Sequence, residues 1–243
     1  MTMKQYLFIF FFLFLILPSF PGHAELPGSF SATYNLYYDD LRIGVMERHL
    51  SRKEDGSGTF ESNGKLTGLA AFFRKDKISE SSRWEISQGK LRPVEYKYKK
   101  TGGKKEKTET HLFDWSKNKV ISTTQSDKKE LNTKPGLMDK LLYQLAVMEL
   151  KDPESGIEFN LIDGITFKNY QFKYKGKETL STPMGKLKTL KFQRKRPGVT
   201  NENHKRSTII WCAPSLHYLP IRVDIVNKKG HLTSIVIKKV QGL

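Results

Sequence analysis

One stretch of this sequence, Pro135–Leu150, has the hydrophobic periodicity of a long α-helix. Its apolar residues recur at spacings that place them on one helical face: Leu137, Leu141, Leu145 and Met148. Asp139 falls in the first turn, where a carboxylate is stabilised by the helix dipole. Pro153 then prevents continuation. We therefore expect one central helix over about 137–150.

Almost all of the remaining chain alternates apolar and polar side chains, as half-buried β-strands do. Phe30–Tyr38 is an example, and turn signals such as Ser87–Lys90 separate about a dozen similar segments. We expect a mainly β protein, with a large antiparallel curved sheet that forms a half-barrel or a closed barrel around the helix. The short run Gly68–Phe73 is predicted to be a helical turn that seals one end of the sheet.

Residues 1–24 have the organisation of a secretory signal peptide. Lys4 precedes the apolar run Tyr6–Leu17, and Gly22 and Ala24 provide the small residues of a cleavage site. The run is shorter than the roughly 20 apolar residues of a spanning helix, which disfavours an uncleaved anchor. We expect a cleaved signal helix at 1–24 and a single β-rich domain at 25–243. The expected location is the periplasm of a Gram-negative bacterium, free or peripheral to the outer membrane.

The formal net charge is +17. Basic proteins commonly bind nucleic acid, membrane surfaces or acidic polymers, and export disfavours nucleic acid. We expect a monomer whose partners are anionic lipid, lipopolysaccharide or envelope proteins. The residues predicted to form a basic surface are Lys97, Lys99, Lys104, Lys105, Lys107, Arg194 and Arg196. The alternative is that the lysines only solvate the outer face of the sheet.

Sequence motifs of common enzyme classes are absent. There is no Gly-x-Ser-x-Gly elbow and no dinucleotide or phosphate loop. No two histidines have the spacing of a local metal pair. The single cysteine, Cys212, cannot form an intramolecular disulfide and is expected to be a buried thiol. We expect no cofactor, no metal and no catalysis, although a hydrolase site assembled from distant residues stays open.

Several polar or charged residues lie beside tryptophans or on the predicted helix, as in the wall of a ligand cavity. The candidates are Arg83, Trp84, Asp114, Trp115, Asp139, Trp211 and Arg222. The alternative is that the tryptophans belong to the core, Asp114 caps a turn and Asp139 acts on the helix dipole.

A series of short motifs resembles, in its order along the chain, the bacterial domain-of-unknown-function family 3108. The motifs are Phe30-x-Ala-x-Tyr34, Gly44, Gly68-Leu-Ala70, Ser82-Arg83, Gly89-x-Leu91-Arg-Pro93, Phe113-Asp-Trp115, Pro135-Gly136, Asp139, Thr182-Pro-x-Gly185, Trp211-x-Ala213-Pro214, Tyr218-Leu-Pro220 and Arg222. The resemblance spans Phe30 to Val240. It implies an exported, β-rich envelope protein without an established activity.

Three functions remain open. The leading one is binding of an amphipathic or anionic envelope component, such as a lipid, an acyl group or a part of lipopolysaccharide, in a barrel-like cavity. The second is an interaction or scaffold protein of envelope assembly with a filled core and no ligand. The third is a hydrolase, which a buried cluster of carboxylate, histidine and serine would favour.

Overall fold

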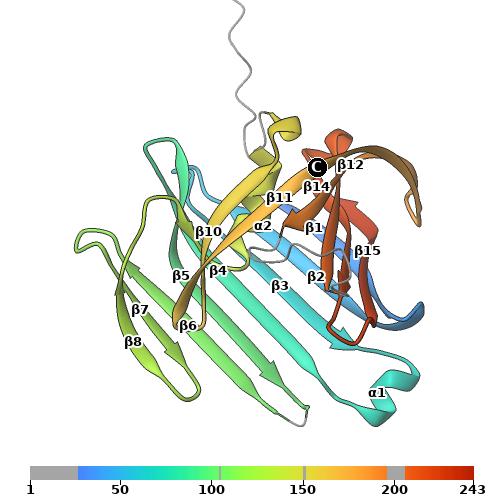
Figure 1. The fold of residues 1–243 in the computed structure, drawn as a ribbon, viewed down its shortest axis with the longest axis horizontal. Coiled ribbons are helices and arrows are strands. Elements are labelled where there is room, and N and C mark those ends of the chain that lie inside the picture. Colours follow the sequence, from blue (N-terminus) through green and yellow to red (C-terminus); the bar gives the residue numbers. More distant parts are fainter. Residues whose placement is uncertain (1–26, 104, 150–151, 196–205) are drawn as a thin grey trace, which may run out of the picture.

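The computed structural model describes residues 27–103, 105–149, 152–195 and 206–243. In these ranges the chain forms one 15-stranded sheet with two short α-helices (Figure 1). The predicted signal peptide, Lys104 and Arg196 lie outside the described residues. Within the described ranges, no helix has the length and hydropathy needed to cross a bilayer.

The first half of the described chain is a meander of successive strands. These are β1 (Phe30–Tyr38), β2 (Leu41–Arg52), β3 (Gly58–Leu66), β4 (Lys77–Ser87), β5 (Lys90–Thr101), β6 (Lys107–Asp114), β7 (Lys119–Thr124) and β8 (Lys128–Asn132). Helix α1 (Leu69–Phe73) connects β3 to β4. The strands β1 to β7 were expected, because they have one buried and one solvated face. β8, which has no buried residue, was not expected.

The second half returns through a shorter strand and two turns before its own meander. Its elements are β9 (Leu137–Met138), α2 (Leu142–Ala146), the 3-10 turns η1 (Val147–Glu149) and η2 (Pro153–Ser155), β10 (Ile157–Asp163), β11 (Thr166–Thr182), β12 (Gly185–Lys195), β13 (Ser207–Ala213), η3 (Pro214–Leu216), β14 (Leu219–Val226) and β15 (Leu232–Gln241).

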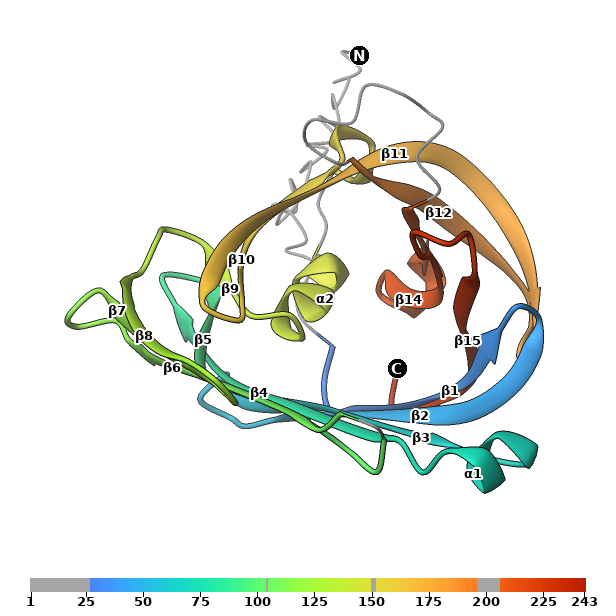
Figure 2. The ribbon, with the colours of Figure 1, turned by 60° about the horizontal axis from the view of Figure 1, so that its bottom comes forward.

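The two meanders join through β1 and β15, which pair antiparallel from Ser31 opposite Gln241 to Tyr38 opposite Thr233. The strand order is β8-β7-β6-β5-β4-β3-β2-β1-β15-β14-β13-β12-β11-β10-β9, antiparallel throughout except for the parallel pair β9 and β10. The sheet curves around on itself (Figure 2) and brings β9 against β5. Since β8 and β9 are the two ends of the described sheet, strand pairing does not close the barrel.

Helix α2 lies on the concave side of the sheet (Figure 2). Leu141, Leu142 and Leu145 are fully buried there and belong to the same core cluster as Tyr34 and Trp84 of the sheet. The apolar side chains of α2 therefore fill the interior beside the strands.

The helix is shorter than the predicted span of 137–150. Leu137 and Met138 pair with β10 instead, and α2 has only five residues before the 3-10 turn η1. The Asp139 carboxylate accepts hydrogen bonds from the backbone N–H groups of Leu141 and Leu142, at 2.8 and 2.7 Å. These bonds satisfy free donors at the start of a helix, and they set its beginning after Asp139.

The helical turn predicted at Gly68–Phe73 is present as α1, but it does not seal the sheet. None of its residues is buried. Leu69 is 77% exposed, Phe72 85% and Phe73 86%.

Candidate site on the inner face of the sheet

The strand register places five polar side chains in one row across the sheet. Arg48 on β2 lies opposite Ser62 on β3, which lies opposite Glu80 on β4. Glu80 lies opposite Tyr98 on β5, and Tyr98 lies opposite Glu109 on β6. Residues directly opposite one another share a face. We call these five residues the polar row, and it lies on the inner face because Arg48 and Glu109 are buried.

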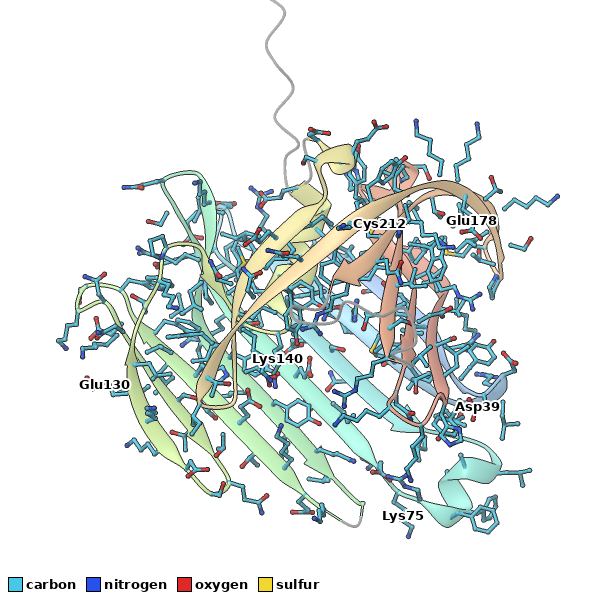
Figure 3. All side chains as sticks on the ribbon, in the orientation of Figure 1. Asp39, Lys75, Glu130, Lys140, Glu178 and Cys212 are labelled. Carbon is cyan, nitrogen blue, oxygen red and sulfur yellow. The ribbon has the colours of Figure 1, made fainter. Side chains whose placement is uncertain are left out.

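Glu109 joins distant parts of the curved sheet. Its carboxylate accepts hydrogen bonds from the Gly164 backbone N–H, at 2.8 Å, and from Lys140 Nζ, at 2.7 Å. Lys140 also forms an ion pair with Asp163, at 3.1 Å. Gly164 and Asp163 lie at the β10–β11 turn, whereas Lys140 lies at the centre of the molecule between β9 and α2 (Figure 3). These contacts hold β6 to the opposite end of the sheet.

His111 and Ser122 complete this set, and we call Glu109, His111, Ser122, Lys140, Asp163 and Gly164 the clasp. His111 Nε2 lies 2.9 Å from the Glu109 carboxylate. Burial by itself raises the pKa of Glu109, but hydrogen bonds from His111, Lys140 and the Gly164 amide outweigh it. They hold the pKa well below its ordinary value, so the carboxylate is ionised at neutral pH.

The clasp contains the residue types of a hydrolase triad. Ser122 Oγ lies 2.9 Å from His111 Nδ1, and His111 in turn contacts Glu109. The Ser122 hydroxyl, however, donates to the Gly164 carbonyl oxygen, whereas a nucleophile donates to its general base. Ser122 and His111 are both fully buried, so a substrate has no access to the hydroxyl. This geometry suits a polar contact across the sheet better than catalysis.

Arg48 differs from the clasp because no described carboxylate forms an ion pair with it. It is only 4% exposed, yet the described residues place no carboxylate within ion-pair distance of its guanidinium. The guanidinium carbon lies 5.1 Å from the centre of the Tyr34 ring, and Nε has no hydrogen-bond partner. An uncompensated buried charge is strongly unfavourable. Such a group is a candidate contact for an anionic ligand.

Glu80 does not supply a full counter-charge. Burial raises its pKa to about 7, and the nearby charges of Lys140 and Arg48 offset this only partly. The negative charges of Asp139 and Glu109 act in the same direction as burial. At neutral pH, Glu80 is therefore only partly ionised.

A second arginine faces the interior from the opposite wall. Arg194 on β12 stacks on the Tyr170 ring, with its guanidinium carbon 3.3 Å from the ring centre, and its buried Nε has no hydrogen-bond partner. The positive charges of Arg48 and Arg194 both lower the pKa of Tyr143 on α2. Burial raises the pKa of Tyr143 to about 12, and the two arginines partly oppose that rise. Both therefore lie near α2 inside the curved sheet.

Replacing Glu80 by glutamine should flatten the pH dependence of stability between about pH 4.5 and 7. In that range the folded protein binds more protons at Glu80 than the unfolded chain does, because the folded pKa is the higher. The contribution of Glu80 to wild-type stability should therefore fall as pH rises through this window, and Glu80→Gln should be more stable than wild type above it, by on the order of 2 kcal/mol. Urea unfolding at several pH values measures the difference, with the exposed Glu61→Gln as control. Parallel pH curves for wild type and Glu80→Gln would contradict this.

The sequence model of the family described as "Protein of unknown function (DUF3108)" matches residues 33–236. The chain belongs to the DUF3108 family. The resemblance seen in the sequence motifs is thereby confirmed. A search of curated proteins found no match to this DUF3108 protein.

Searches of solved structures found matches to this DUF3108 protein at low sequence identity. The crystal structure of a β-barrel-like protein of domain of unknown function DUF1849 from Brucella abortus is 7% identical, with a TM-score of 0.56. The match covers 88% of this chain and 98% of that chain. A protein with a YmcC-like fold from Bacteroides fragilis NCTC 9343 is 12% identical, with a TM-score of 0.35, and the match covers 88% and 96% of the two chains. At 7% identity, the first likeness supports the barrel-like fold alone.

The predicted cavity residues of this DUF3108 protein do not form one wall. Trp84 points into the core and is 2% exposed, whereas its neighbour Arg83 is exposed and pairs with Glu95 at 3.0 Å. Asp139 is fully buried and accepts a hydrogen bond from Ser82, at 2.6 Å. Trp84 and Asp139 are thus on the inner side, and Arg83 is not.

The other predicted cavity residues lie at the β6–β7 turn and on strands β13 and β14. Asp114 accepts hydrogen bonds from Ser116 and Lys117 and so organises the β6–β7 turn, while Trp115 donates to the Pro93 carbonyl. Trp211 and Arg222 are cross-strand neighbours on β13 and β14. Trp211 is buried and belongs to the same core cluster as Trp84, and its indole donates to Glu178 at 2.9 Å. Glu178 lies at the outer end of β11 (Figure 3).

The predicted basic surface is also divided. Lys97 pairs with Glu95, and Lys107 reaches the clasp, 3.5 Å from Glu109. Lys99 and Lys105 are exposed. Arg194 was expected beside these lysines, but it belongs to the interior because its strand turns that side chain inward with Phe192.

Proposed function

We propose that this protein is a non-enzymatic periplasmic protein that binds an anionic, amphipathic molecule on the inner face of its curved sheet. Arg48 carries this proposal, since a carboxylate or phosphate head group would supply the full counter-charge that the described residues do not. Met46 and Leu50 flank Arg48 on the same strand and belong to the core cluster, so the charge lies in apolar surroundings. Arg194 adds a second cation on the other side of α2.

Other features support an envelope location. Residues 1–24 have the organisation of an export signal, and the net charge of +17 suits partners such as anionic lipid or lipopolysaccharide. The scaffold alternative has its own support, because Leu141, Leu142 and Leu145 fill the interior beside α2. The two functions differ in whether the purified protein retains a ligand.

Native mass spectrometry of the protein purified from its own envelope should show a retained mass that Arg48→Met lacks. The reason is that the substitution removes the cation while keeping an unbranched apolar stem. Arg83→Met is the matched control, since Arg83 is an exposed arginine of the same sheet and its loss should leave the retained mass unchanged. Equal retention by Arg48→Met would contradict the site, and no added mass in wild type would favour the scaffold.

After removal of bound material, titration with a fatty acid and with a phosphatidic acid would separate the two head groups. Tighter binding of the fatty acid would assign the site to carboxylates, and tighter binding of phosphatidic acid would assign it to phosphates. Arg48→Met should weaken the binding of both ligands by at least about tenfold, because buried charge-assisted hydrogen bonds are among the strongest hydrogen bonds in proteins.

A further inference from the structure

Helix α1 presents apolar side chains to solvent that a folded domain ordinarily buries. Leu69, Phe72 and Phe73 are 77%, 85% and 86% exposed, and no residue of α1 is buried. The helix projects from the edge of the sheet at the end of β3 (Figure 1). Contiguous exposed apolar residues with a polar surround mark interaction sites.

The exposure is not the result of a loosely held segment. Arg74 donates two hydrogen bonds to Asp76, at 2.7 and 2.9 Å, and Lys100 of β5 pairs with the same carboxylate at 3.2 Å. The β5–β6 hairpin packs closely here, since a Cβ atom on Gly102 would lie 2.0 Å from the Lys75 carbonyl oxygen. The base of α1 is therefore fixed to the hairpin, and its apolar residues are held outward.

Basic side chains surround these apolar residues. Phe72 and Phe73 line an open hollow whose other residues are Arg74, Lys75, Lys100, Gly102, Gly103 and Lys105. Asp76 offsets part of the charge of Arg74 and Lys100. Lys75 and Lys105 have no acidic partner among the described residues, and Lys75 points away from the molecule near α1 (Figure 3). We call Leu69, Phe72, Phe73, Arg74, Lys75 and Lys105 the tip.

We propose that the tip docks the protein on an anionic lipid bilayer, with Leu69, Phe72 and Phe73 in the interfacial region and the basic residues on lipid phosphates. Apolar and aromatic side chains beside lysines suit that region of a bilayer. A stable protein partner buries roughly 1,200 Å² or more in total, which three side chains on one projecting turn do not supply. A bilayer needs no complementary groove, and its negative surface matches the charge of the tip.

This inference is independent of the site at Arg48. Docking by the tip needs no ligand on the inner face, and ligand binding at Arg48 needs no bilayer. Bilayer docking and ligand binding can therefore be lost separately, and each can be measured by itself. Arg48→Met should sediment with vesicles as wild type does.

The test is co-sedimentation of the exported protein with vesicles of phosphatidylglycerol and phosphatidylethanolamine, compared with phosphatidylcholine, at low and high salt. Wild type should bind the anionic vesicles at low salt. Phe72→Ser/Phe73→Ser should weaken binding by at least about tenfold. Lys75→Gln/Lys105→Gln should reduce both the binding and its salt dependence. Leu41→Ser/Leu112→Ser, which changes exposed apolar residues elsewhere, should bind like wild type.

The depth to which the tip enters the bilayer is measured separately with Phe73→Trp. Its tryptophan fluorescence should be quenched by lipids brominated near the interface, whereas the fluorescence of Leu41→Trp should not be quenched. All altered side chains are exposed, so thermal unfolding of the variants should match wild type. Equal binding of wild type and Phe72→Ser/Phe73→Ser, equal binding to neutral vesicles, or no binding at low salt would overturn the proposal. So would a wild-type dimer that Phe72→Ser/Phe73→Ser dissociates, because the tip would then be a contact between copies of the chain.

Discussion

Replacing Glu109 by alanine should lower the free energy of unfolding at pH 7 by about 3–5 kcal/mol, the range for breaking a buried charged network. The substitution leaves Lys140, His111 and the Gly164 amide without the carboxylate that they share. It also removes the direct link between β6 and the β10–β11 turn. Urea unfolding of the two proteins measures this loss.

The pH dependence gives an independent check on the clasp. Because the folded-state pKa of Glu109 is lowered, its contribution is present above the ordinary pKa of about 4.5 and is lost as pH falls toward the folded value. The stability difference between wild type and Glu109→Ala should therefore shrink in acid. Glu106→Ala, an exposed neighbour, should cost less than about 0.5 kcal/mol. A cost under about 1 kcal/mol for Glu109→Ala would mean that the clasp does not hold the sheet.

Leu141→Ala should cost about 2–5 kcal/mol, the usual range for truncating a buried leucine. Leu141 is fully buried in the core cluster between α2 and the sheet, and its loss leaves a cavity that the strands can fill only partly. Denaturant unfolding should show a lower midpoint with an unchanged slope. The matched control is Leu112→Ala, since Leu112 is 45% exposed. Similar losses for the two variants would mean that α2 does not anchor the interior.

Most of the strands could be predicted from the sequence because one of their faces lies in the core and the other in solvent. The position of the helix along the chain could be predicted, but its first and last residues could not. Leu137 and Leu141 have helical spacing, yet Leu137 is buried by pairing of β9 with β10. The contact that starts α2 involves Asp139, which Ser82 holds from another strand. A periodic pattern carries no information about such a distant partner.

The candidate site on the inner face of the sheet could not be predicted from the sequence for a related reason. Alternation tells which residues share a face of one strand, but not which residues of neighbouring strands are opposite them. The polar row depends on that register. A usable signal existed along single strands, since Arg48 lies between Met46 and Leu50 at a spacing of two. A charged residue at a core position is a more specific signal than a polar residue beside a tryptophan.

The pairing of β1 with β15 bears on how the chain reaches its fold. Each meander is made of hairpins between successive strands, which can form as soon as both strands are available. Ser31, however, meets Gln241 only when nearly the whole chain is present. Until then one edge of β1 is unpaired, and an unpaired edge invites pairing with another chain. Pairing of β1 with β15 is thus a late contact in terms of sequence separation, and until it forms, the free edge of β1 is a place where aggregation with a second chain would begin.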